Sequence, residues 1–175
     1  MPEPEVPARR WPSSHLWQPV PSFAPPPPEA ARQLAALWQD LDRRLAEPQA
    51  ACRACGRCCD FPRQSHILFA TRLELEVCLS WARDHAVVAE PTARRRLAAG
   101  ECPFLEAGRC AVRPARPVGC RIFFCQPPHP DLLEETVLVA QQGLQSISMG
   151  HIGLRWYGPA LAYLEINVSH IHCGD

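Results

Sequence analysis

Cysteine is the residue through which this chain is best equipped to do chemistry. The sequence has 175 residues and 10 cysteines, most of which fall in two segments. The first segment is the run Cys52-Arg-Ala-Cys55-Gly-Arg-Cys58-Cys59, and the second carries Cys102, Cys110, Cys120 and Cys125. Cysteines at this density form disulfides, bind metal ions or act as redox groups, and the cellular compartment decides among these uses.

The spacing within the first segment indicates a metal site. A C-x2-C pair lets two thiolates converge on one ion while the backbone between them turns, and Gly56 suits such a turn because glycine tolerates positive φ. The C-x2-C-x2-C run is close to the ferredoxin pattern, in which a remote cysteine precedes proline as Cys102 precedes Pro103. The neighbours Cys58 and Cys59 point apart, so either one of them binds while the other supports it, or they face different ions.

We therefore expect a thiolate site for zinc or iron, with an iron–sulfur cluster as one form of it. Two separate sites and one polynuclear cluster are both compatible with so many thiols. The predicted metal ligands are Cys52, Cys55, Cys58, Cys59, Cys102, Cys110, Cys120 and Cys125. Cys78 is expected to be a core residue instead, since it falls on an apolar helix face.

Arginines lie among the cysteines and could offset the negative charge of thiolates. They are Arg53, Arg57, Arg109, Arg113, Arg116 and Arg121. We favour Arg116 and Arg121 for this role. Since every basic residue of the chain is arginine, a general compositional bias explains the pattern equally well.

Other features limit the classes of function. No apolar stretch occurs near Met1, so we expect no signal peptide, a cytoplasmic location and reduced thiols. We also expect no membrane partner, because no run is long and apolar enough to span a bilayer. The 18 basic and 18 acidic residues balance, which argues against nucleic acid as a partner. The chain has no nucleotide-binding or hydrolase motif, and whether it is an enzyme stays open.

Two histidine-containing features are weaker candidates. The sequence His170-Ile-His172-Cys173 could add ligands to a metal site, although residues near a terminus are often mobile. His66 could approach the first cysteine segment, but a solvated histidine is the better expectation. We interpret Trp156 to Pro159 as a turn with aromatic packing.

The cysteine segments resemble the CxxCxxCC family, also called YkgJ-type, which is described as zinc- or iron-chelating. The resemblance covers roughly residues 52–125 and rests on the first run, Cys102-Pro-Phe-Leu, Gly108-Arg-Cys110 and Arg116-Pro-x2-Cys120-Arg-x-Phe. It implies a cysteine cluster that binds zinc, iron or an iron–sulfur centre. Cys125 departs from the commonest form of the motif, and Cys78 and Cys173 lie outside it.

The predicted fold is mainly α with irregular cysteine-rich loops, with a small α+β arrangement as the alternative, and forms a single metal-centred domain. Residues 1–28 are rich in proline and are expected to form a disordered or semi-rigid tail that could bind a protein partner. Residues 29–175 form the domain. Apolar periodicity, capping residues and prolines predict helices over 29–47, 72–84, 91–99, 131–148 and 159–165, and a strand over 66–70.

Three functions are compatible with these features. The first is metal binding for chelation, delivery or structural support. The second is an iron–sulfur redox protein or enzyme; transferase chemistry is conceivable because some larger proteins with this type of domain are linked to lysine methylation of flagellin. The third is a metal-free thiol redox sensor, which ranks last because no thioredoxin-like setting surrounds the C-x2-C pairs.

Overall fold

The fold is mainly helical, as expected from the sequence. The computed structural model describes residues 19–46, 56–123, 127 and 129–171. The α-helices of this part of the chain are α1 (Pro28–Arg44), α2 (Phe61–Gln64), α3 (Arg72–Asp84), α4 (Glu90–Ala98), α5 (Val118–Arg121), α6 (Pro130–Gly150) and α7 (Ala160–Asn167). Short 3-10 turns occupy η2 (Arg57–Cys59), η3 (Arg113–Ala115), η4 (Ile152–Leu154) and η5 (Val168–Ile171).

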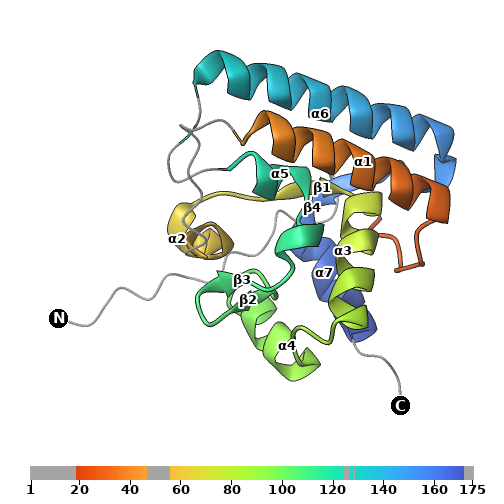
Figure 1. Ribbon diagram of the computed structural model, residues 1–175. Helices are drawn as coiled ribbons and strands as arrows, with labels where there is room; N and C mark the ends of the chain where they lie inside the picture. Colours follow the sequence, from red (N-terminus) through yellow and green to blue (C-terminus); the bar gives the residue numbers. More distant parts are fainter. Residues whose placement is uncertain (1–18, 47–55, 124–126, 128, 172–175) are drawn as a thin grey trace.

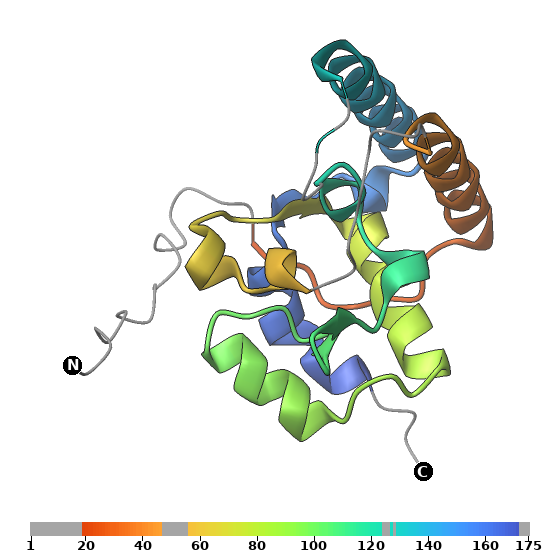
Figure 2. The same cartoon turned by 60° about the vertical axis from the view of Figure 1, so that its left-hand side comes forward.

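The helices pack around two adjoining cores. The long helices α1 and α6 lie side by side, and Figures 1 and 2 show them as a pair on one side of the molecule. Leu34, Trp38 and Leu41 recur on one face of α1 at helical spacing and are buried there. The second core lies among α3, α4, α7 and η5, where Leu79 and Leu161 are buried. Trp81 packs against both cores and so connects them.

The predicted helices are confirmed, with small shifts at their ends. Helix α1 ends at Arg44, before Pro48, and α4 is followed by Gly100, whose φ of +75° is readily adopted only by glycine. Helix α3 spans the residues predicted for it. The expected capping box is present, since Thr71 and Glu74 each accept a hydrogen bond from the other's backbone N–H.

Two short antiparallel sheets complete the fold. Strand β1 (Phe69–Thr71) pairs with β4 (Tyr157–Pro159), with Ala70 opposite Gly158. The interpretation of Trp156 to Pro159 as a turn was therefore wrong for its last three residues. They form an extended strand because the backbone of β1 supplies their hydrogen-bond partners. Residue 158 has no room for a side chain, since a Cβ there would lie 2.5 Å from the Trp156 ring. The strand predicted over 66–70 is confined to the shorter β1.

The second sheet is a hairpin within the second cysteine segment. Strands β2 (Leu105–Glu106) and β3 (Arg109–Cys110) are joined by Ala107 and Gly108. These two residues have φ of +45° and +73°, the left-handed conformation that a two-residue hairpin turn requires. Cys110 is thereby placed at the end of a rigid hairpin.

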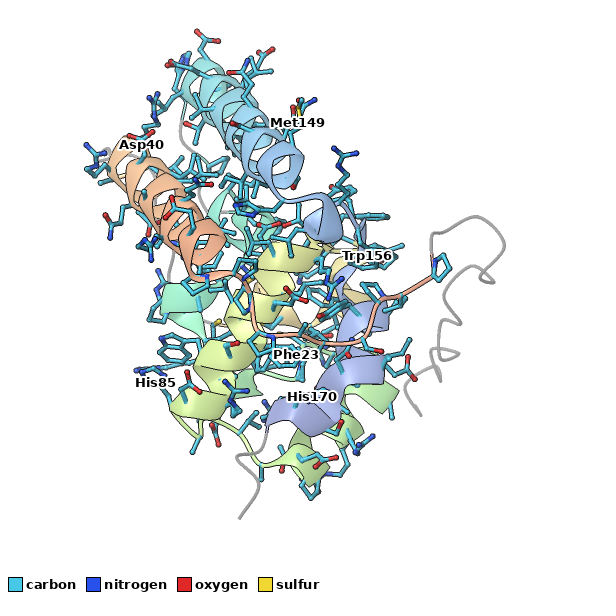
Figure 3. All side chains as sticks on the ribbon, turned by 90° about the vertical axis from the view of Figure 1, so that its right-hand side faces the viewer. Phe23, Asp40, His85, Met149, Trp156 and His170 are labelled. Carbon is cyan, nitrogen blue, oxygen red and sulfur yellow. The ribbon has the colours of Figure 1, made fainter. Side chains whose placement is uncertain are left out.

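Part of the predicted tail lies on the domain. Residues 1–18 are outside the described residues, whereas residues 19–27 run extended over α3 and α7. The Phe23 N–H donates to the Asn167 side chain over 2.6 Å, and Asn167 donates to the Pro21 carbonyl over 3.1 Å. The Phe23 ring stacks on His170 with ring centres 4.9 Å apart. Figure 3 labels both residues, which lie close together. These contacts fix residues 19–27 in place despite their proline content.

None of the helices formed by the described residues has the length and apolar character needed to cross a bilayer.

Candidate metal centre

Six cysteines line one small cavity between the two cysteine segments. The cavity has a volume of about 50 Å³, and its thiols are Cys58, Cys59, Cys78, Cys102, Cys110 and Cys120. They come from η2, α3, the loop before β2, β3 and α5. The rest of the wall is mainly apolar, with Phe61, Leu75 and Phe104 among its residues, and Arg113 and Arg116 add positive charge.

The first segment is shaped by Gly56 and joined directly to the second. Gly56 has φ of +70°, and its carbonyl accepts a hydrogen bond from the Cys59 N–H at 2.9 Å. This tight turn directs Cys58 and Cys59 to the cavity. The Cys59 carbonyl then accepts from the Cys102 N–H at 2.9 Å, so the backbones of the two segments are hydrogen bonded where their cysteines meet.

The other cysteines are held by the hairpin and by α5. The Ala111 N–H donates to the Phe104 carbonyl at 2.8 Å, which closes the hairpin that carries Cys110, and Cys102 lies two residues before this bond. Helix α5 is fixed by Glu74, whose buried carboxylate accepts from the Val118 N–H at 2.7 Å while also capping α3. The capping box predicted at Thr71 therefore has a second role, because it positions the helix that carries Cys120.

Cys59 lies at the centre of the described thiols. Its sulfur is in hydrogen-bonding contact with those of Cys102, Cys110 and Cys58, and these contacts raise the pKa of the Cys59 thiol. Hydrogen-bonding contact with Cys59 is the largest cause that lowers the pKa of Cys58 to about 6 and that of Cys110 to about 7. Cys58 and Cys110 are thus the two thiols beside Cys59 whose pKa is lowered.

The two arginines in the cavity wall also lower the pKa of nearby thiols. The positive charges of Arg116 and Arg113 help to lower the pKa of Cys58, and Arg116 also helps to lower that of Cys110. Burial, by contrast, raises the pKa of Cys78 and Cys120 well above the usual thiol value. A cation in the cavity would stabilise all of these thiols in their ionised form.

Arg121, favoured from the sequence together with Arg116, interacts electrostatically with Cys120 and has a structural role as well. Its guanidinium donates to the Asp42 carboxylate at 2.6 Å and to the carbonyls of Pro114 and Arg116 at 2.5 and 2.9 Å. It also lies over the Trp38 ring, 4.4 Å from the ring centre. Its hydrogen-bonding capacity is used to attach α1 to the loop before α5, whereas Arg116 lines the cavity.

The remaining sequence candidates divide into those that the structure places and those outside its described residues. Cys52, Cys55, Cys125, His172 and Cys173 belong to the second group, as does Arg53. His170 stacks on Phe23, and His66 stacks on Phe123 with ring centres 5.4 Å apart. Cys78, expected to be a plain core residue, is buried as predicted but also lines the thiol cavity. Helical periodicity indicated its buried face, and no sequence signal showed which loops cover it.

A larger hollow of about 500 Å³ adjoins the thiol cavity. Cys58 and Cys120 line both spaces, and the hollow is otherwise bounded mainly by apolar and aromatic side chains, including His66, Phe69 and Tyr157. Cys58 and Cys120 are both partly buried.

The described side chains do not already form a complete metal-ligand group. Within those residues, no set of three or more His, Cys, Asp and Glu has the arrangement of ligands around one ion. Cys59 is instead in hydrogen-bonding contact with Cys58, Cys102 and Cys110. In comparisons with known proteins, the chain matches no family model, no curated protein and no solved structure.

Proposed function

We propose that this protein binds zinc or iron through its cysteine cluster. The observation that carries the proposal is the contact of the Cys59 thiol with Cys58, Cys102 and Cys110, two of which come from the other cysteine segment. Cys120 lines the same cavity, and Cys52, Cys55 and Cys125 are added as ligands from the sequence motif. The resemblance to the CxxCxxCC family supports the same assignment and is itself part of the proposal.

The donor set suits these metals. Thiolate is the ligand preferred by zinc and by iron–sulfur centres, and four thiolates at about 2.3 Å complete a tetrahedral zinc site. Sulfurs in such a site are close neighbours, as Cys59 and the three thiols in contact with it are. Small shifts of these side chains would convert mutual hydrogen bonds into shared coordination. Arg113 and Arg116 supply the positive charge that a tetrathiolate site needs nearby.

The position of the cavity suggests what metal binding would do for the fold. The cavity lies where η2, the β2–β3 hairpin and α5 meet, and these elements are short. A bound ion would link them, and part of its binding free energy would stabilise the folded state. In the iron form the centre would in addition supply one-electron redox chemistry.

An iron–sulfur redox protein is the second candidate. One observation favours it over a single zinc ion: the C-x2-C-x2-C run that ends at Cys58, together with Cys102-Pro103, is close to the ferredoxin pattern. The two candidates differ in colour, because an iron–sulfur centre absorbs visible light and a zinc centre does not.

The test compares metal content in the wild type with that in Cys59→Ser, using protein purified without oxygen. We expect the variant to lose most of the metal, because its side chain lies among three other ligands. The control is Val88→Ala, which weakens the same core but does not line the cavity. Equal metal content in wild type and Cys59→Ser would contradict the proposal. Loss of metal from Val88→Ala but not from Cys59→Ser would show that the stability of the core, and not ligation by Cys59, controls the metal content.

A further inference from the structure

A groove runs between α6 on one side and α5 with the β1–β4 sheet on the other, elements that Figure 1 shows close together. It consists of the hollow of about 500 Å³ that Cys58 and Cys120 line and of a second hollow of about 440 Å³. The residues that line both hollows are Phe69, Gly119, Ile122, Val137 and Tyr157. The two hollows therefore adjoin along this shared wall and form one groove.

The groove follows one face of α6. Its lining residues on this helix recur at helical spacing from Leu133, which lines the hollow beside Cys58, to Ser148 in the second hollow. These two residues are fifteen positions apart, which corresponds to about 22 Å along a helix. An extended acyl chain is about 15 Å long, half the hydrocarbon thickness of a bilayer. One such chain with its headgroup therefore fits the length of the groove.

The walls of the groove are mainly apolar and partly open to solvent. Ile67, Phe123 and Tyr157 line it with exposed fractions of 37%, 43% and 59%. Phe69 and Tyr157 line it from the paired strands β1 and β4, with ring centres 5.7 Å apart. Aromatic and aliphatic side chains left open around a hollow of this size are typical of a site that binds an apolar molecule.

The second hollow has a cation that is available to a ligand. Its carboxylate and guanidinium groups are those of Glu74 and Arg155. The Glu74 oxygens already accept hydrogen bonds from the N–H groups of Thr71 and Val118. Arg155 is exposed, and none of the described residues forms an ion pair with it. Uncharged side chains of α6 that can donate hydrogen bonds line the same hollow, namely Gln141, Gln145 and Ser148. This end of the groove therefore favours an anionic group.

We propose that the groove binds a long-chain carboxylate, whose carboxylate lies at Arg155 and whose acyl chain extends along α6 toward Cys58. The apolar walls and the length of the groove select the chain, and Arg155 selects the anionic headgroup. Binding is noncovalent, so no bond forms or breaks. The proposal goes beyond metal binding and does not depend on it, because neither the chain nor the carboxylate needs a metal ion as a partner.

Displacement of the fluorescent fatty acid cis-parinaric acid from the full chain tests the proposal. We expect palmitate to displace it, and the neutral alcohol hexadecanol to compete at least about tenfold less well, because the alcohol has no charge for Arg155. Each methylene added between decanoate and palmitate should tighten binding by up to about fourfold. Equal competition by palmitate and hexadecanol, or affinity that does not change with chain length, would overturn the proposal.

Two pairs of variants locate the ligand. Arg155→Gln should weaken palmitate binding about tenfold and leave hexadecanol binding unchanged, whereas Arg95→Gln, at an exposed arginine of α4 outside the groove, should change neither. Val137→Trp fills the groove where its two hollows adjoin and should weaken binding of both compounds. Its control is Leu138→Trp, at the next position of α6, which is 51% exposed and does not line the groove. Unchanged palmitate affinity in Arg155→Gln would overturn the proposal even if Val137→Trp does not fold.

A second copy of the chain is the alternative occupant of this groove, and sedimentation velocity distinguishes it. We expect the wild type without fatty acid to be a monomer. A dimer that palmitate leaves intact and that Val137→Trp dissociates would overturn the proposal. Because none of these measurements involves a metal ion, failure of this proposal leaves the proposed function standing, and failure of metal binding leaves this proposal standing.

Discussion

Gly56 approaches Gly108 so closely that a Cβ atom at residue 56 would lie 2.5 Å from the Gly108 carbonyl oxygen. This contact joins the turn before Cys58 to the hairpin turn before Cys110. Real Cβ atoms do not approach a backbone oxygen so closely, and the φ of +70° at Gly56 is also unfavourable for other residues. The close packing of the two cysteine segments therefore requires a residue without a side chain at position 56.

Gly56→Ala should therefore separate the segments. We expect the metal-free protein to lose about 2–4 kcal/mol of unfolding free energy, from left-handed strain and from overpacking against Gly108. The matched control is Gly108→Ala, which has φ of +73° but open space around its Cβ position, so it should lose only about 1 kcal/mol. Urea unfolding measures both values. Equal losses in the two variants would show that the close approach has no energetic importance.

Glu74 gives a second prediction, because its carboxylate joins α3 to α5. Glu74→Ala removes the acceptor for the Thr71 and Val118 N–H groups, which donate at 2.8 and 2.7 Å. Leaving buried donors unpaired costs about 1–3 kcal/mol each, so we expect a loss of at least about 2 kcal/mol, measured by chemical unfolding. The same variant should bind metal more weakly, since Cys120 follows Val118 by two residues. Unchanged metal affinity would show that α5 stays in place without Glu74.

The same carboxyl group predicts how stability depends on pH. Burial raises the pKa of Glu74 above its ordinary value of 4.5 in the folded state. Below pH 4.5 the group is protonated in both states; above it the unfolded state loses its proton first, so stability falls as pH rises until the folded group ionises. The difference between wild type and Glu74→Gln, followed by urea unfolding from pH 4 upward without metal, should show this fall. A difference that is constant with pH would contradict it.

Arg121 should be required mainly for folding. Arg121→Ala leaves two buried carbonyls without their donor and uncovers Trp38, so we expect a loss of about 2 kcal/mol in thermal unfolding. Arg121→Lys should restore little, because a single ammonium cannot reproduce the planar fork of the guanidinium. Full stability of the lysine variant would show that charge alone is sufficient.

Substitution of Arg116 should change the reactivity of the thiols in the cavity. Contact with Cys59 chiefly, and the charge of Arg116 to a smaller extent, lower the pKa of Cys58 to about 6, so this thiol ionises more readily than an ordinary one in the metal-free protein. Arg116→Ala should raise the Cys58 pKa and slow its alkylation by iodoacetamide at pH 7 several-fold, with little change above pH 9. Peptide mass spectrometry identifies the modified cysteine. An unchanged pH profile would remove Arg116 from the electrostatics of the site.

The helices could be predicted because their signals are local. Apolar residues at helical spacing, prolines at the starts and the Thr71–Glu74 capping box lie within each segment and need no distant partner. Strand β4 could not, since Tyr157, Gly158 and Pro159 have the composition of a turn and become extended only beside β1. The position of residues 19–27 likewise depends on Asn167, which lies far along the chain.

The candidate site was predictable in its residue types but not in its arrangement. Spacing singled out Cys58, Cys59, Cys102, Cys110 and Cys120, which the structure brings to one cavity. The contribution of Cys78 and the different roles of Arg116 and Arg121 depend on which surfaces meet in three dimensions. The charge of Arg121 is evident from the sequence, but its hydrogen bond to Asp42 exists only because the fold brings the two residues together.

The most direct test of the central claim is the metal content of the wild-type protein after anaerobic purification, measured by elemental mass spectrometry together with a visible spectrum. We predict zinc or iron bound at one or more ions per chain, with brown colour and matching sulfide if the centre is iron–sulfur. Protein that folds with neither metal, and whose 10 cysteines all titrate as free thiols, would contradict the account.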